Sequence, residues 1–199
     1  YSEYDLKELE NSNKLVLPKQ ILQDLSKYEE LEYPLHFSIN DSNILFIPSE
    51  FKDIDNIYIS QHFLENLGIE VGNQIKITLL NKKIPKGNKI VLKPHTSKFL
   101  DIMDHKHFLE KHLVKLYSTL SLGQTIIIPR DNSNILIDVL GCEPNETISI
   151  IDTDLEVEFE EPWDYNEKSV TKQIEKETFE SCMKNFKKVK FNFIRKQQL

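Results

Sequence analysis

A pattern of helix, glycine turn and alternating strand occurs twice in the chain and constrains its fold more than any other feature. In the first copy, a helix is predicted after Ser60, whose hydroxyl suits the N-cap, and a turn at Gly72 leads into a strand. In the second copy, a helix predicted over about 104–120 leads through Gly123 into an apolar strand. Two copies are too few for a solenoid, so we expect two subdomains built from related parts.

Short apolar runs bounded by polar turn residues occupy most of the remaining chain. Residues 155–160 alternate apolar side chains with carboxylates, as expected of a strand with one buried and one exposed face. Pro18 suits the first position of a helix, and a helix of about two turns is predicted behind it. Further strands are predicted over about 14–17, 35–39, 44–47, 57–59, 71–77, 90–94, 125–128, 135–140 and 147–151. The predicted fold class is therefore α+β and mostly β.

The composition excludes several classes of protein. With 39% hydrophobic and 10% aromatic residues, the chain of 199 residues is globular rather than disordered or collagen-like. No apolar run approaches the roughly 20 residues of a membrane span. Neither of the 2 cysteines belongs to a CxxC pair, so a reducing compartment is expected. The 5 glycines are dispersed, which argues against a phosphate-binding loop.

Charge is distributed unevenly along the chain. Residues 1–165 hold 16 basic and 28 acidic side chains, whereas residues 166–199 hold 9 basic and 4 acidic ones. An acidic body repels nucleic acid phosphates at long range, so nucleic acid is not an expected partner. A basic or amphipathic protein fits this charge better.

Histidines and cysteines form no coherent metal or nucleophile pattern. His105 and His107 are two residues apart, so on a helix their side chains point in different directions, and no zinc motif includes His112. These histidines are interpreted as solvated or capping side chains. Cys142 and Cys182 lack any surrounding catalytic signature, and they are interpreted as a buried filler or an incidental surface thiol.

Paired carboxylates are the remaining candidates for catalysis. Asp152 and Asp154 share one face of a predicted strand, and Glu160 and Glu161 follow. A row of acids on a strand is usually a solvated face that discourages aggregation. No nucleophile elbow, P-loop or dinucleotide motif occurs. We therefore predict a binding module with no catalytic activity, no cofactor and no metal.

Several short motifs follow one another in a specific order. They are Lys14-Leu15-Val16-Leu17-Pro18, Tyr33-Pro34-Leu35, Glu70-Val71-Gly72-Asn73-Gln74-Ile75, Ile84-Pro85-Lys86-Gly87, Phe99-Leu100-Asp101-Ile102, Leu120 with Gly123, and Ile148-Ser149-Ile150-Ile151-Asp152. This order resembles the N-terminal ubiquitin-binding domain of the ubiquitin fusion degradation family, which recruits substrates for the hexameric AAA ATPase known as valosin-containing protein. The collinear matches extend over about residues 14–165.

The resemblance implies a two-part body and a tail. A double-psi β-barrel is expected over residues 14–95, and a smaller α/β roll over residues 98–165. Residues 169–199 carry a weak apolar stripe near helical spacing, and a helical tail is expected there. The duplicated strand and turn units of such barrels agree with the repeated pattern at Gly72 and Gly123.

The implied function is that of a non-catalytic adaptor. The body of such a protein binds ubiquitin or polyubiquitin on a client, and the following segment binds the nuclear-protein-localisation partner and the ATPase. The client is then extracted for degradation or translocation. An acidic body suits ubiquitin, because the interaction face of ubiquitin combines an apolar patch with basic residues.

Partner contacts are expected in two exposed segments at the seam between the subdomains. The residues are Lys86, Gly87, Asn88, Pro94, His95 and Thr96. The alternative interpretation is that these are ordinary surface loops. Phe99, Leu100 and Ile102 are expected to pack the two subdomains together rather than to touch a partner.

The sequence departs from the family pattern in three loops and in one motif. Asn73 stands in place of aspartate, His95 and Thr96 replace a Gln-Ser pair, and residues 103–105 replace a Thr-Asn-Pro helix start. The short ATPase-binding motif of the family needs two glycines, and no glycine follows Gly141. Either the motif lies beyond this sequence or the ATPase is contacted in another way.

Two other functions remain open at this stage. The body is compatible with a double-psi-barrel enzyme or a small-molecule-binding protein, since one fold hosts many functions. A scaffold whose tail alone binds a partner is the third possibility.

The family is found at the cytosolic face of the endoplasmic reticulum and in the nucleus. A complex plastid is the alternative compartment, because the sequence starts at Tyr1 rather than at a methionine.

Overall fold

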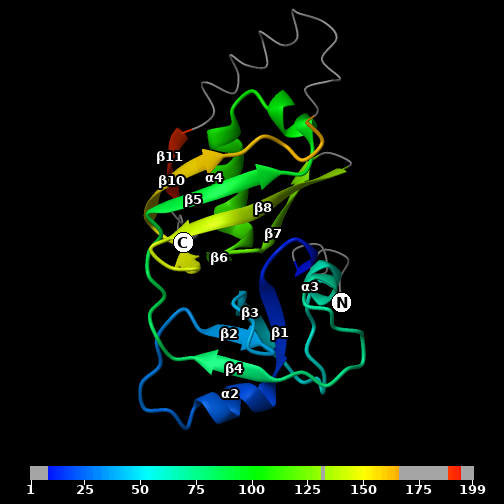
Figure 1. Cartoon of the computed structure of the whole chain (residues 1–199). Coiled ribbons are helices and arrows are strands. Elements are labelled where there is room, and N and C mark those ends of the chain that lie inside the picture. The colour runs from blue at the N-terminus through cyan, green and yellow to red at the C-terminus, as the bar shows by residue number, and fades with distance from the viewer. Residues whose placement is uncertain (1–8, 131–132, 166–187, 194–199) are drawn as a thin grey trace, which may run out of the picture.

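Strands dominate the computed structural model, which describes residues 9–130, 133–165 and 188–193 (Figure 1). One sheet has four strands in the order β1 (Lys14–Pro18), β3 (Leu45–Lys52), β2 (His36–Ile39) and β4 (Ile77–Leu80). The β1 and β3 strands run parallel, whereas β2 is antiparallel to both of its neighbours. The short helices α2 (Lys19–Leu25) and α3 (Gln61–Asn66) flank this sheet.

A second sheet has five strands with β5 (Lys89–Pro94) at its centre. The order is β11 (Lys188–Phe193), β10 (Thr153–Phe159), β5, β8 (Ser133–Glu143) and β7 (Thr125–Arg130). The β5 strand is parallel to β10 and antiparallel to β8. A small ladder of β6 (Thr119–Ser121) and β9 (Thr147–Ser149) lies where this sheet meets the four-stranded one.

Helix α4 (His105–Leu116) and the 3-10 helix η1 (Ser97–Asp101) cover one face of the five-stranded sheet (Figure 1). Asp104 caps α4, because its carboxylate accepts a hydrogen bond from the His107 amide at 2.9 Å. Leu109 and Leu113 of α4 are buried and pack in the core together with Phe99. Among the described residues, no helix lies on the opposite face of the sheet, which is called the uncovered face.

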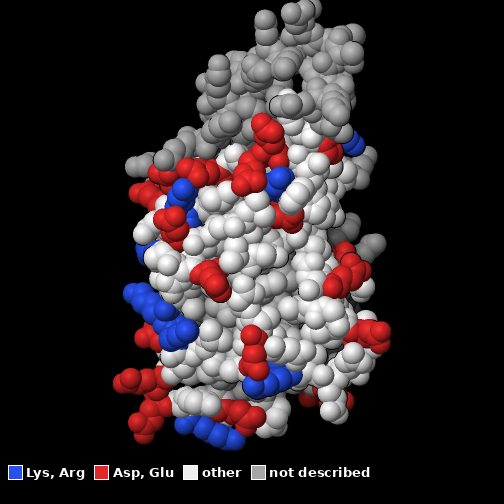
Figure 2. All heavy atoms as spheres, viewed as in Figure 1, with Lys and Arg blue, Asp and Glu red and all other residues white. Residues whose placement is uncertain are grey.

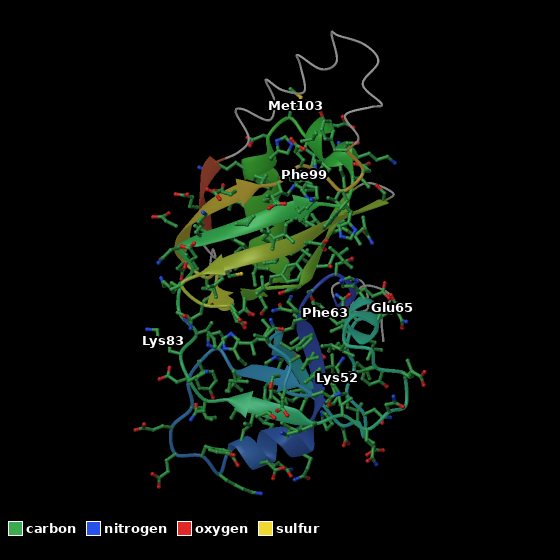
Figure 3. The ribbon with its side chains drawn as sticks, viewed as in Figure 1. Lys52, Phe63, Glu65, Lys83, Phe99 and Met103 are labelled. Atoms are coloured by element: carbon green, nitrogen blue, oxygen red, sulfur yellow. The ribbon has the colours of Figure 1, made fainter. Side chains whose placement is uncertain are left out.

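A single hydrophobic core joins the two sheets. Phe37 and Phe46 of the four-stranded sheet belong to the same buried cluster as Leu92 and Ile137 of the five-stranded sheet. In Figure 3, Phe63 of α3 points inward, and its ring centroid lies 5.0 Å from that of Phe46. Burying each such side chain stabilises the fold by about 1.5–3 kcal/mol.

Most predicted elements are confirmed, together with the α+β class and the predominance of strands. Ser60 caps α3 through its hydroxyl, which accepts a hydrogen bond from the Phe63 amide. Gly72 and Gly123 have φ angles of 94° and 79°, which is the conformation that their predicted turns require. The alternating segment 155–160 is strand β10, with its apolar residues buried.

Four predictions are corrected by the structure. The helix predicted to reach Leu120 ends at Leu116, and residues 57–59 form only one bridge, between Tyr58 and Val16. The strand predicted over 71–77 begins at Ile77. Of the helix predicted over 169–199, residues 166–187 and 194–199 lie outside the described residues, and Lys188–Phe193 form a strand.

Candidate partner-binding surfaces

The uncovered face of the five-stranded sheet is strongly charged. The residues of β10 that alternate with its buried side chains are Asp154, Glu156 and Glu158, and Glu160 follows the strand. Lys89 and Lys93 of the neighbouring strand β5 lie 2.9 Å from Glu158 and 3.6 Å from Glu160. Figure 2 shows red side chains gathered over β10 at the upper left, with blue ones among them. The carboxylates of Glu158 and Glu160 are therefore already paired with lysines.

A polar cluster around Asp138 stands at the other end of this face. The Asp138 carboxylate contacts the His95 Nε2 atom at 2.8 Å and accepts hydrogen bonds from the Thr125 hydroxyl at 2.7 Å and the Trp163 indole at 2.9 Å. Lys93 Nζ lies 3.8 Å from the centre of the Trp163 ring, which is cation–π geometry. Four separate segments of the chain thus meet at one carboxylate.

The Asp138 carboxylate is held in its ionised form. Partial burial raises its pKa, but the hydrogen bonds from His95, Thr125 and Trp163 outweigh burial, so that the pKa lies below its usual value. The cluster is linked to α3 as well, since His62 Nε2 lies 3.2 Å from the Thr125 carbonyl oxygen. This network fixes the position of Trp163, whose side chain is 59% exposed.

The six predicted partner-contact residues do not form one site, because they lie at opposite ends of β5. Lys86 and Asn88 are exposed, but Gly87 between them is buried. The Lys86 ammonium donates to the Asp152 carbonyl, and the Gly87 amide donates to the Ser149 carbonyl at 3.0 Å. This segment is therefore integrated into the sheets, next to β9 and β10.

The second predicted segment, Pro94 to Thr96, contributes His95 to the cluster around Asp138. Pro94 is buried, and its carbonyl accepts a hydrogen bond from the Trp163 amide at 3.0 Å. His95 contacts Asp138, and Thr96 is exposed. Phe99 is buried, and its ring centroid lies 5.7 Å from that of Phe159, but both residues belong to 98–165, so the expected packing between the two subdomains stays a prediction.

The seam between the two sheets is polar and tightly bonded. Asn13 is fully buried, and its amide donates to the Leu45 carbonyl at 2.9 Å and to the Thr119 hydroxyl at 3.3 Å. The Asn43 amide donates to the Leu122 carbonyl at 2.8 Å. Side-chain hydrogen bonds thus connect the two sheets along this seam.

A further exposed surface, residues 28–33, follows α2 and is called the tyrosine loop. Tyr28 and Tyr33 are 56% and 74% exposed. The Asn81 side chain fixes the loop from β4, because it accepts from the Glu32 amide at 2.9 Å and donates to the Glu30 carbonyl at 3.1 Å. This loop is not among the predicted partner contacts, although its two tyrosines among three glutamates are a visible signal in the sequence.

Metal and thiol chemistry find little support in the described part of the chain. No group of three or more His, Cys, Asp or Glu side chains there is placed to hold a metal ion. His105 contacts the Phe99 carbonyl at 2.9 Å, and its pKa is lowered chiefly by burial. Burial raises the pKa of Cys142 to about 12, so its thiol stays protonated at neutral pH. Cys182 lies outside the described residues.

None of the helices in the described segments is both long enough and apolar enough to span a bilayer.

Comparison with known proteins points in one direction. Residues 86–162 match the family described as ubiquitin fusion degradation protein UFD1, N-terminal subdomain 2. The chain is 32% identical over 168 residues to the ubiquitin fusion degradation protein 1 homolog of Dictyostelium discoideum, covering 80% of this chain and 48% of the relative. It is 30% identical over 179 residues to ubiquitin fusion degradation protein 1 of Saccharomyces cerevisiae, covering 82% and 47%.

A human relative carries a more explicit name. The chain is 27% identical over 179 residues to the ubiquitin recognition factor in ER-associated degradation protein 1 of Homo sapiens, covering 87% of this chain and 57% of the relative. The chain therefore spans about half the length of the curated relatives that it matches.

Proposed function

Because the chain belongs to the ubiquitin fusion degradation protein 1 family, we propose that it is a non-catalytic adaptor that binds ubiquitin or polyubiquitin on client proteins. It delivers these clients to a hexameric AAA unfoldase of the valosin-containing-protein type, for extraction followed by degradation or translocation. A nuclear-protein-localisation partner assembles with it. The observation that carries the proposal is the human relative, which is named as a ubiquitin recognition factor.

The fine structure of the fold is part of this proposal. We assign residues 14–95 to a double-psi β-barrel, residues 98–165 to an α/β roll and residues 169–199 to the tail. The mixed parallel and antiparallel pairing of the four-stranded sheet supports a barrel of interlocked strands. The β5 strand belongs to the barrel by this division, and it pairs with β8 and β10 of the roll.

The charge of the body supports ubiquitin as the ligand. Residues 1–165 hold 28 acidic side chains against 16 basic ones, and ubiquitin presents basic residues around its apolar patch. Complementary potentials accelerate encounter and orient the partner. The segments Lys86 to Asn88 and Pro94 to Thr96 remain proposed partner contacts, of which His95 is tied to the exposed Trp163 through Asp138.

The proposed compartment follows from the relatives. ER-associated degradation appears in the name of the human relative, which supports the cytosolic surface of the endoplasmic reticulum, with the nucleus as a second location. The complex plastid is the alternative. Determining the sequence that precedes Tyr1 in the encoded protein distinguishes these compartments, because plastid delivery requires a signal and transit peptide.

A titration with ubiquitin tests the function directly. The isotope-labelled 199-residue chain is titrated with monoubiquitin and with tetraubiquitin, and amide chemical shifts are followed by NMR. We expect a limited set of amides to shift in a saturable way. A small basic protein that is not related to ubiquitin is the control for general charge attraction. Unchanged spectra at millimolar ubiquitin would overturn the proposal.

A further inference from the structure

The tyrosine loop exposes more aromatic surface than the rest of the four-stranded sheet and its helices. Tyr28 and Tyr33 are 56% and 74% exposed, and Leu22 on the neighbouring helix α2 is 48% exposed. Within the described residues, neither tyrosine ring has a hydrogen bond or a ring contact. Tyrosine is enriched in the centres of protein interfaces, because its ring buries a large area while its hydroxyl keeps a polar partner.

The loop is held in one conformation before any partner arrives. The Asn81 side chain makes hydrogen bonds to the backbone of Glu30 and of Glu32 from the end of strand β4. On either side of the loop, Leu25 and Leu35 are buried in the core. A prepositioned loop loses little conformational entropy on binding, which favours affinity.

Three glutamates lie between the two tyrosines in the sequence. Glu29, Glu30 and Glu32 are exposed within the loop, and Asp24 precedes it. Lys27 makes an ion pair with Asp24 at 2.6 Å, so the three glutamates keep the loop acidic. Two lysines, Lys82 and Lys83, directly follow the anchoring residue Asn81, and Figure 3 shows Lys83 on the left side of the molecule. Residues 22–33 therefore expose one leucine, two tyrosines and three glutamates that have no ion pair among the described residues, all in a short stretch of the chain.

From this arrangement we infer that the tyrosine loop and Leu22 form the surface on which the apolar patch of ubiquitin is seated. This inference rests on the proposed function. The apolar patch packs on Leu22, Tyr28 and Tyr33, and the basic residues around it face the three glutamates. Matching an apolar centre and opposite rim charges is the complementarity that protein interfaces use.

The uncovered sheet face fits this ligand less well. Trp163 already donates to Asp138 and supports Lys93, and the carboxylates of Glu158 and Glu160 are paired with lysines. A partner that docks there meets side chains that already have partners within the chain. The tyrosine loop offers unoccupied rings and unpaired glutamate charges in the described structure, so docking there costs less.

Substitutions in the 199-residue chain test the inference in the same NMR titration with monoubiquitin. We expect the largest shifts at the amides of residues 22–33, and an increase of at least about tenfold in Kd for the double variant Tyr28→Ala and Tyr33→Ala. Met103→Ala is the control, because Met103 is also an exposed apolar residue but lies beside α4. Its Kd should equal that of the unmodified chain.

The charge contribution needs its own pair of variants. Replacing Glu29, Glu30 and Glu32 by glutamine should weaken binding about threefold or more, with a loss that shrinks as salt is added. The control replaces Asp53 and Asp55 by asparagine and Glu70 by glutamine, which changes net charge equally on other exposed loops. Equal weakening by both triple variants would show general charge attraction and overturn the proposed surface.

The outcomes separate the inference from the proposed function. Saturable ubiquitin binding with shifts confined to other residues, unaffected by the tyrosine variants, overturns the inference and leaves the function in place. No binding to either ubiquitin form by the unmodified chain overturns both. Native spectra of each variant, recorded before the titration, establish that any loss of binding does not come from unfolding.

Discussion

The indole nitrogen of Trp163 donates a hydrogen bond to the Asp138 carboxylate over a distance of 2.9 Å. The bond ties the segment that follows β10 to strand β8. Trp163 is the single tryptophan of the sequence, so its fluorescence reports on this corner of the protein alone. The fluorescence of the Trp163 indole can therefore be used to follow the cluster around Asp138 that positions it.

Replacing Asp138 by asparagine should destabilise the fold. We expect Asp138→Asn to lower the free energy of unfolding by about 2 kcal/mol. The asparagine NH₂ group would face the Thr125 hydroxyl or the Trp163 indole, which both donate hydrogen bonds to Asp138. Urea denaturation followed by Trp163 fluorescence measures the loss. Asp154→Asn, on the exposed side of β10, should change the unfolding free energy by less than about 0.5 kcal/mol. Similar losses in the two variants would show that the cluster contributes nothing specific.

Adding one methyl group at Gly87 should be costly. A Cβ atom at this position would lie 2.5 Å from Ile148 Cδ1 and 2.8 Å from Leu155 Cδ1, and both side chains are fully buried. We expect Gly87→Ala to lower the free energy of unfolding by about 1–3 kcal/mol, which urea denaturation measures. Gly141→Ala is the control, since a Cβ atom added there would have Val91 Cγ2 as its nearest neighbour, at 3.4 Å. A neutral Gly87→Ala variant would mean that the β9 and β10 side chains repack freely.

The buried imidazole of His36 should make stability depend on pH. Burial lowers the pKa of His36 below 6.5, against a smaller opposing effect of a hydrogen bond with the Pro34 backbone. The unfolded chain therefore binds this proton more readily, and stability falls as pH drops through 6.5 towards the lowered pKa. We expect a lower urea midpoint at about pH 5.5 than at about pH 7.5.

Two variants identify the histidine responsible. His36→Phe should reduce the difference between the two midpoints, and the part that remains is attributed to His105 and His112, whose pKa values are also lowered chiefly by burial. His107→Asn, at an exposed position, should leave the difference unchanged. A His36 ring resonance that titrates at or above 6.5 in NMR spectra would contradict the prediction.

Local patterns in the sequence were sufficient where local physics decides the structure. The alternation of residues 155–160 identified strand β10 and its buried face, because a period of two places every second side chain on one side. The hydroxyl of Ser60 identified the start of α3 for a similarly local reason. These elements depend on neighbours in sequence.

Other features depend on partners far along the chain, and the sequence could not reveal them. Leu120 continues the helical spacing of α4, but in the structure it pairs with Ile148 as part of the β6–β9 ladder, which prevails over helix propensity. His95 was selected as part of a loop. Its partner Asp138 and the nearby Trp163 come from two distant segments, and no spacing rule connects them.

The central position of β5 has a consequence for the order in which the protein is made. Residues Lys89–Pro94 leave the ribosome long before their partners in β8 and β10, which begin at Ser133 and Thr153. Until then the backbone groups on both edges of the nascent strand have no neighbouring strand to pair with. The apolar side chains of Ile90 and Leu92 likewise have no core in which to be buried. Such long-range pairing slows folding and leaves an aggregation-prone intermediate during translation. A chain whose central strand pairs so late thus passes through a stage that favours protection by a chaperone.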